Sequence, residues 1–279
     1  MKTKNAMQLK SFIKKKAAEH QISAQLVMQN YMMERLLERI SLSKYQRNFI
    51  LKGGFLIAAI VGLDTRTTMD MDTTIKGFSL NHESLRDIFE EICAVSIEDD
   101  VSFTVSQITD IREGDDYPGL RVHLEASYPP LKVPIKVDVT TGDKVTPREI
   151  EYSYKLMFDE YSISVLAYNL ETILAEKLET VLSRNIANTR PRDFYDIYIL
   201  SALRGVECDM AVLRHALDET TLKRGSSSIL PQYREITEKI QADPQMNRLW
   251  EKYKEFSYAK DIAFSDTCAT ILRIMENII

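Results

Sequence analysis

Two aspartates separated by one residue are the strongest chemical signal in this sequence. Asp70 and Asp72 lie in the segment 68–75, which is predicted to form a β-strand. Because alternate residues of a strand share a face, the two carboxylates project together, about 6–7 Å apart. At that separation they repel by about 2–3 kcal/mol at an effective dielectric near 20. A cation between them removes the repulsion, and Mg²⁺ is typically held by one or two carboxylates plus nucleotide phosphates. The alternative is a pair of surface aspartates on an edge strand.

A pair of glycines before this strand predicts a phosphate-binding turn. Gly53 and Gly54 follow a predicted strand over 48–52 and open a short apolar helix over 55–61. Glycine has no Cβ, so backbone N–H groups can approach a phosphate closely. The N-terminus of the helix adds unpaired N–H donors and a partial positive charge. The order strand, Gly-Gly, helix, Asp-x-Asp strand therefore predicts a phosphate cradle beside a metal site.

A third carboxylate lies on a later predicted strand. Asp138 and Lys136 share one face of the segment 133–139, whose valines and Ile135 form the other face. A two-metal phosphoryl-transfer site needs a further acid of this kind. Asp138 is therefore a candidate third metal ligand, and the alternative is a simple ion pair with Lys136.

Charged residues also fall where a helix should be apolar. On the predicted helix 170–183, Lys177 and Glu171 lie within the apolar stripe, whereas Glu179 falls on the solvent side. An inward lysine is costly unless it is paired or used, so Lys177 is expected to contact the nucleotide phosphates. The alternatives are an ion pair with Glu171 or an ammonium that reaches back to solvent. Asp193 is also expected to point inward, or else to complement a helix N-terminus.

The elements that must position these residues define an α+β protein. Helical spacing predicts an N-terminal helical lead-in over 8–46, and alternation predicts strands between 48 and 140, with Met69 and Met71 facing the core. A turn is predicted over 114–119, and helical patterning continues from residue 169 to the end. We therefore predict a nucleotide-binding α/β domain over 1–160 and a helical C-terminal domain over 161–279.

Composition excludes several other classes. The 279 residues are 44% hydrophobic and 28% charged, with a net charge of −5, which is ordinary for a globular protein. No apolar stretch is long enough to cross a membrane, and the N-terminus lacks the apolar core of a secretory signal. Three scattered cysteines indicate reduced thiols in the cytoplasm rather than a disulfide framework or zinc site. The four histidines show no metal-ligand spacing, and neither a P-loop nor a Gly-x-Ser-x-Gly motif is present.

The ordered motifs together resemble a known family. Leu51-Lys52-Gly53-Gly54, Arg66-Thr67-Thr68-Met69-Asp70-Met71-Asp72, Leu174-Ala175-Glu176-Lys177-Leu178 and Arg192-Asp193-Phe194-Tyr195-Asp196 look like those of the AbiEii/AbiGii nucleotidyltransferase toxins. This family belongs to the DNA polymerase β-like superfamily. The resemblance spans roughly residues 45–205 and implies a polymerase-β-like mixed sheet.

The resemblance also implies a function and a set of site residues. It implies a toxin of abortive infection and phage defence, with a neighbouring antitoxin, that transfers a nucleotide from an NTP with Mg²⁺ to an RNA, the tRNA 3′ end above all. Asp70, Asp72 and Asp138 would bind metal, and Lys177 and Asp193 match the lysine and aspartate of the later motifs. The expected nucleotide-binding residues are Lys52, Gly53, Gly54, Arg66, Thr67, Thr68 and Lys136.

One departure and two alternatives remain. Many superfamily members carry serine where this chain has Gly54, so the hydroxyl contact to phosphate would have to come from Thr67 or Thr68. The same chemistry could act on a protein acceptor or on the toxin itself. A third hypothesis is a nucleotide-binding module of a toxin–antitoxin pair without transfer activity.

Overall fold

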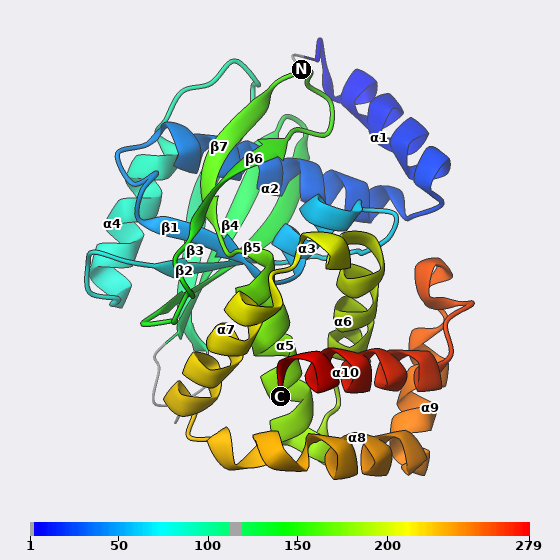
Figure 1. Ribbon diagram of the computed structural model, residues 1–279. Helices are drawn as coiled ribbons and strands as arrows, with labels where there is room; N and C mark the ends of the chain where they lie inside the picture. Colours follow the sequence, from blue (N-terminus) through cyan, green and yellow to red (C-terminus); the bar gives the residue numbers. More distant parts are fainter. Residues whose placement is uncertain (1–2, 112–118) are drawn as a thin grey trace. The chain divides into compact units, whose positions relative to one another are not determined.

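The computed structural model describes residues 3–111 and 119–279, which form two compact units (Figure 1). The first unit consists of Met1–Asp143 and Ile150–Ala167, and the second of Lys144–Glu149 and Tyr168–Ile279. The prediction placed the change of unit between residues 160 and 161 and did not include the short segment Lys144–Glu149 in the second unit. The turn predicted over 114–119 lies outside the described residues, apart from its last glycine.

A seven-stranded mixed sheet forms the centre of the first unit, which confirms the α+β fold class. Its spatial order is β3-β4-β5-β2-β1-β7-β6. The outer pairs are antiparallel, whereas β2 runs parallel to β5 and β1 runs parallel to β7. The strands are β1 (Phe49–Lys52), β2 (Met71–Ile75), β3 (Ser102–Ile111), β4 (Gly119–Tyr128), β5 (Leu131–Thr141), β6 (Ile150–Lys155) and β7 (Ser162–Ala167).

The strand β2 is shorter than the sequence predicted. It begins at Met71, whose side chain is fully buried as expected, but Met69 is 47% exposed, so its predicted place in the core is wrong. The carbonyl of Met69 accepts a hydrogen bond of 2.8 Å from the side chain of Gln29, and that of Thr68 accepts one of 2.9 Å from Asn30. These side-chain amides, rather than a neighbouring strand, satisfy the backbone here, and the chain bends before it enters the sheet.

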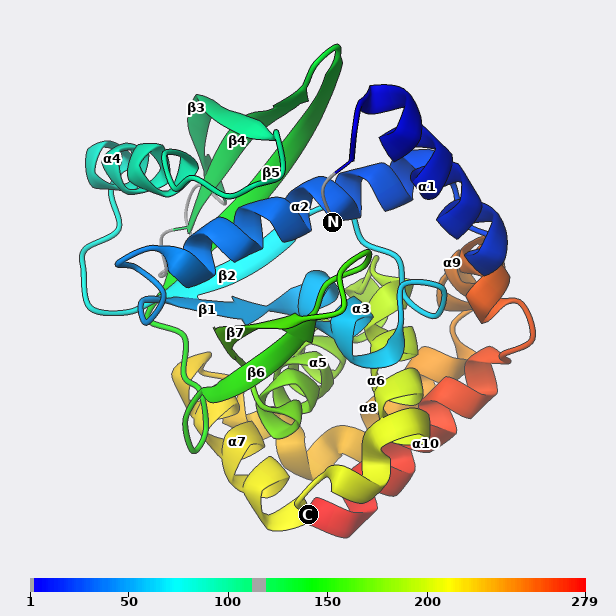
Figure 2. The same ribbon diagram turned by 90° about the horizontal axis from the view of Figure 1, so that it is seen from above.

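Four helices complete the first unit, and the second of them runs along one face of the sheet (Figure 2). They are α1 (Ala6–His20), α2 (Ala24–Leu42), α3 (Gly53–Val61) and α4 (His82–Cys93). Helix α2 contacts β5, β7 and α4, and α4 contacts β3. Ile135, Val137 and Val139 of β5 are buried beneath this layer, whereas Lys136 and Asp138 lie on the opposite face of the strand.

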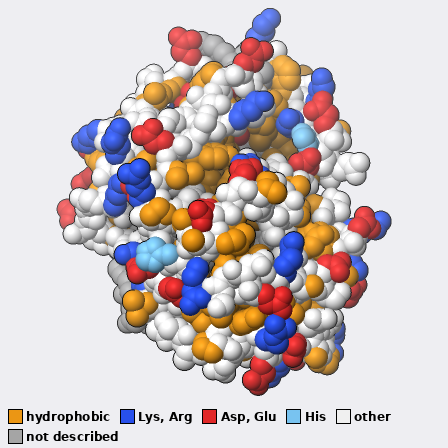
Figure 3. All heavy atoms as spheres, in the orientation of Figure 1, with side chains coloured by type: hydrophobic (Ala, Val, Ile, Leu, Met, Phe, Trp, Pro, Cys, Tyr) orange, Lys and Arg blue, Asp and Glu red, His pale blue; other side chains and the backbone are white. Residues whose placement is uncertain are grey.

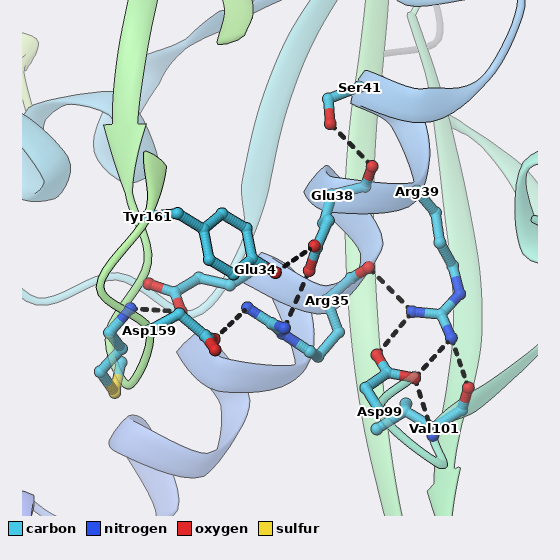
Figure 4. Close-up of polar contacts among 10 residues, drawn as sticks. Glu34, Arg35, Glu38, Arg39, Ser41, Asp99, Val101, Asp159 and Tyr161 are labelled. Atoms are coloured by element: carbon cyan, nitrogen blue, oxygen red, sulfur yellow. Dashed lines mark hydrogen bonds and ion pairs between the residues drawn. The ribbon is translucent and has the colours of Figure 1, made fainter. Parts of the chain in front are cut away.

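Helix α2 carries buried charges as well as apolar residues (Figure 4). Arg35 lies 2.8 Å from Glu38 and 3.4 Å from Asp159, in the turn between β6 and β7. Arg39 donates two hydrogen bonds of 2.9 Å to Asp99, ahead of β3. Buried charges are tolerated when they are paired in this way, so these contacts fasten α2 to segments on both of its sides.

The second unit is helical from residue 170 onward. Helix α5 packs against α6 and α7, and α10 packs against α6, α7 and α8.

Within the described residues, no helix combines the length and apolar character needed to cross a membrane. Positive and negative side chains are interspersed on the face shown in Figure 3. The main helices are α5 (Leu170–Arg184), α6 (Pro191–Arg204), α7 (Met210–Lys223), α8 (Tyr233–Ala242), α9 (Pro244–Tyr253) and α10 (Phe264–Ile278).

Candidate functional site

The Gly-Gly turn leaves room for a carboxylate that lies against it. Gly53 begins α3 with a φ of 63°, in the left-handed region that favours glycine. A Cβ on Gly53 would lie only 2.1 Å from Oδ2 of Asp72, and the backbone N–H of Gly54 donates to the same oxygen at 3.2 Å. The turn and the second aspartate of the Asp-x-Asp pair therefore form one structural unit, as the order of the motifs predicted.

A hydroxyl and a guanidinium lie beside the second glycine. A Cβ on Gly54 would be 3.0 Å from Oγ1 of Thr68 and 3.4 Å from Nη2 of Arg66. The Thr68 hydroxyl donates to the carbonyl of Asp70 at 3.2 Å, and the buried Arg66 donates to the carbonyl of Thr67. Of the two threonines considered as substitutes for a serine at position 54, Thr68 is the one whose hydroxyl lies next to that position.

Four charged residues form a row across the sheet. On adjacent strands, Lys52 of β1 pairs with Asp72 of β2, Asp72 with Asp138 of β5, and Asp138 with Arg121 of β4. Residues directly opposite one another on neighbouring strands share a face. The row therefore places two acids side by side with a cation beyond each of them. Asp70 lies in the bend before β2 and not within the strand as predicted, so strand alternation does not place its carboxylate beside that of Asp72.

The partner of Asp138 differs from the one that the sequence suggested. Arg121 donates to both oxygens of Asp138 at 2.7 Å, from Nε to Oδ1 and from Nη2 to Oδ2. Lys136 is exposed on the same face of β5 and is not the ion-pair partner that the simpler interpretation proposed. The hydrogen bonds to Asp138, and then the charges of Asp138, Asp70 and Asp72, raise the pKa of Arg121 well above its ordinary value.

These carboxylates supply oxygen ligands of the kind that Mg²⁺ prefers. However, among residues 3–111 and 119–279 no three His, Cys, Asp or Glu side chains converge closely enough to hold a metal ion. The predicted set of Asp70, Asp72 and Asp138 is therefore not gathered into one three-carboxylate site, and Arg121 donates to both oxygens of Asp138. The arrangement fits a metal held by one or two carboxylates together with phosphate oxygens.

Lys52 has a carboxylate partner that the sequence did not predict. Its ammonium forms an ion pair with Asp143, just beyond the end of β5, and Thr140 donates to the same carboxylate at 2.6 Å. Both charged side chains are largely buried. Lys52 thus enters the row as a paired cation held at the N-cap of α3.

In the second unit, the two residues matched to the later motifs contact each other. The Lys177 ammonium on α5 lies 2.6 Å from Oδ1 of Asp193 and 2.8 Å from Oδ2 of Asp196, both on α6. Asp193 points inward as predicted, and the suggested Lys177–Glu171 pair is wrong, since Glu171 accepts instead from the Asp209 backbone N–H. Asp196 was not predicted as a site residue, although its spacing of three from Asp193 places both on one helix face.

Comparison with solved structures shows the class of fold. A crystal structure from Helicobacter pylori described as a "putative nucleotidyltransferase" matches with a TM-score of 0.50 and 13% identity, over 92% of this chain and 97% of the other. A second Helicobacter pylori structure, of a protein named JHP933, matches with a TM-score of 0.48 and 13% identity, over 92% of this chain and 94% of the other. The comparison with curated proteins gave no match. The seven-stranded mixed sheet with helices is therefore a fold that this chain shares with the first of these structures.

The family follows from the sequence itself. Residues 35–267 match the family described as nucleotidyl transferase AbiEii toxin of type IV toxin–antitoxin systems. This range covers most of the chain and includes Asp70, Asp72, Asp138, Lys177 and Asp193. The chain therefore belongs to the AbiEii nucleotidyl transferase toxin family, as the resemblance predicted.

Proposed function

We propose that this chain transfers a nucleotide from an NTP to an RNA acceptor, with Mg²⁺ held by Asp70 and Asp72. The observation that carries the proposal is the close fit of the Asp72 carboxylate against Gly53 and Gly54. It joins the predicted metal ligand to the predicted phosphate-binding turn. Family membership supports the reaction class, and the tRNA 3′ end is the acceptor that the resemblance favours.

The reaction is an in-line displacement at phosphorus. A hydroxyl oxygen of the acceptor gives up its proton to solvent and forms a bond to the α-phosphorus of the NTP. The bond from that phosphorus to the bridging oxygen breaks, and pyrophosphate leaves with that electron pair. A bound metal ion would neutralise charge on the phosphate oxygens and lower the barrier. The protein's part is to position and neutralise the reacting groups, which supplies most of the catalysis in phosphoryl transfer.

We propose a role for each of the site residues. Asp70 and Asp72 would hold the metal, and Asp138, whose two oxygens accept hydrogen bonds from Arg121, is the third carboxylate proposed for it. The N–H groups at the start of α3, the Thr68 hydroxyl and the Arg66 guanidinium are the donors nearest the turn for phosphate oxygens. In the second unit, Lys177 is proposed to act on the nucleotide phosphates, held in place by its two aspartates.

The proposal also includes a biological setting. As a type IV toxin the chain would act in the cytoplasm, where NTPs and tRNA are present, and a cognate antitoxin encoded nearby would oppose it. Abortive infection and phage defence are the proposed outcomes. Growth arrest on expression of the chain, absent for the Asp72→Asn variant, is the expected result in cells, and arrest by both forms would contradict an enzymatic cause.

The test uses purified protein with Mg²⁺, each of four labelled NTPs in turn, and separated RNA and protein fractions. Label in the RNA fraction, confined to one tRNA-sized species, supports the proposal. Label in the protein fraction would replace it with nucleotidylation of a protein or of the toxin itself. Nucleotide binding without any transfer would favour the non-catalytic module instead.

A further inference from the structure

Arg121 is a charged group of the acidic row that the proposed reaction does not use. It lies within β4, directly opposite Asp138, and its two hydrogen bonds of 2.7 Å engage both carboxylate oxygens. A forked pair between guanidinium and carboxylate is among the strongest ion pairs available to proteins. The pair is two-thirds buried or more on both sides, so water screens it only in part.

The same guanidinium acts on the neighbouring acids. Asp72 and Asp138 lie opposite each other on adjacent parallel strands, where like charges are destabilising. The pKa of Arg121 is raised first by its hydrogen bonds to Asp138 and then by the charges of Asp138, Asp70 and Asp72. Arg121 is therefore the direct counter-ion of Asp138, and its charge also acts on the neighbouring acids Asp70 and Asp72.

A divalent cation would need the same oxygens. Arg121 donates to each oxygen of Asp138 and places a positive charge beside the carboxylate, so a cation that approaches Asp138 meets two engaged oxygens and a like charge. Among the described residues, no three carboxylates converge closely enough to hold a metal ion. We propose that Arg121 is a positioning residue that competes with the metal ion for Asp138, so that this carboxylate joins the metal site only when the guanidinium releases it. This inference rests on the proposed function.

The expected size of the effect follows from the charges. A unit positive charge about 6 Å from a dication weakens its binding about tenfold even at the dielectric of water. Removing the charge should therefore strengthen metal binding by about that factor. A residue that merely orients Asp138 for the metal would have the opposite effect, because its loss would weaken binding.

The experiment is a calorimetric titration of the 279-residue chain with Mn²⁺. We expect Arg121→Gln to bind Mn²⁺ about tenfold more tightly than the unmodified protein, and Arg121→Lys to lie between them, because an ammonium keeps the charge but not the fork. The matched control is Arg47→Gln, an exposed arginine 3.9 Å from Glu151 outside the acidic row, which should not change the affinity. Equal or weaker binding by both Arg121 variants would overturn the inference.

Thermal unfolding supplies a second readout. Without metal, Arg121→Gln should melt at a lower temperature than the unmodified protein, because its acids lose their counter-ion. Saturating Mn²⁺ should raise the melting temperature of Arg121→Gln by more than it raises that of the unmodified protein. If Arg121→Gln does not fold, the affinity of Arg121→Lys decides alone. If the unmodified protein does not bind Mn²⁺, or binds it equally with Asp72→Asn, the proposed function fails. If it binds through Asp72 but the order of the Arg121 variants is reversed, only this inference fails.

Discussion

Replacing Gly53 by alanine should disable the site through one added carbon atom. The new Cβ would lie 2.1 Å from Oδ2, 2.6 Å from Cγ and 2.7 Å from Cβ of Asp72. All three distances are shorter than any real Cβ contact, so Asp72 has to move. Its movement would break the hydrogen bond from Gly54 and displace the proposed metal ligand.

The cost has two separable parts. A residue other than glycine at a φ of 63° costs about 1–2 kcal/mol for the backbone alone. Displacing Asp72 adds about 1–3 kcal/mol, the usual cost of overpacking or of losing a hydrogen bond to a charged group. Gly53→Ala should therefore lower the free energy of unfolding by about 2–5 kcal/mol.

Gly225 provides a matched control for this experiment. Its φ is 65°, nearly the same as that of Gly53, but a Cβ there has no heavy atom within 4 Å. Gly225→Ala should cost only the backbone part and keep full nucleotide transfer, whereas Gly53→Ala should lose transfer at least a hundredfold. Urea denaturation and labelled-NTP transfer measure the two effects. Equal behaviour of the two variants in both assays would refute the role assigned to the Gly53–Asp72 contact.

Three further predictions concern other groups. Thr68→Ala should raise the KM for NTP about tenfold, because one hydrogen bond to a charged group is lost. Adding Gly54→Ser should lower the KM part of the way back. A double variant with a still higher KM would contradict the idea that a serine hydroxyl at position 54 replaces that of Thr68. Burial, opposed by the hydrogen bond from the N–H of Met157, raises the pKa of Glu34 from 4.5 to about 7. The free energy of unfolding should therefore fall by about 3 kcal/mol as pH rises from 4.5 to 7, because the protonated form is favoured in the folded state. Urea denaturation of Glu34→Gln should show no such pH dependence, and an unchanged dependence would mean that another group causes it. Lys177→Ala should lower the free energy of unfolding by about 3 kcal/mol, because two buried carboxylates lose their cation. Adding Asp196→Asn should recover part of that free energy, because it removes one of the two unpaired charges. An unchanged free energy of unfolding in Lys177→Ala would contradict the pairing.

Local patterns predicted the elements of the site well. Alternation in β5 separated the buried valines from Asp138, and helical spacing identified Lys177 and Asp193 as inward charges. The order of Gly-Gly and Asp-x-Asp correctly predicted that turn and carboxylate meet. These inferences needed only the period of a strand or helix and the missing side chain of glycine.

The partners of these charges could not be predicted, because they come from segments distant in sequence. Arg121 reaches Asp138 only because β4 pairs with β5 in a register that alternation does not specify. The ion pair proposed between Asp138 and Lys136 was wrong, because it was based only on their closeness in sequence.

Helix positions show the same limit. Glu179 was expected to face solvent, but it is buried, because Arg224 and Ser226 beyond α7 contact its carboxylate. The position of Glu179 on α5 was predicted correctly, but the segment beyond α7 that covers that side of α5 could not be predicted from the pattern of α5 alone. The buried charges Arg35 and Arg39 of α2 are paired in the same way with acids from elsewhere in the chain.

The central claim is that Asp70 and Asp72 hold the metal on which nucleotide transfer depends. The most direct measurement is incorporation of α-labelled NTP into RNA by the unmodified chain, by Asp72→Asn and by Asp110→Asn, an exposed acid on β3 that pairs with His82. The account predicts Mg²⁺-dependent, EDTA-sensitive labelling by the unmodified chain and by Asp110→Asn, and at least a hundredfold less by Asp72→Asn. Undiminished labelling by Asp72→Asn, or labelling that persists in EDTA, would contradict it.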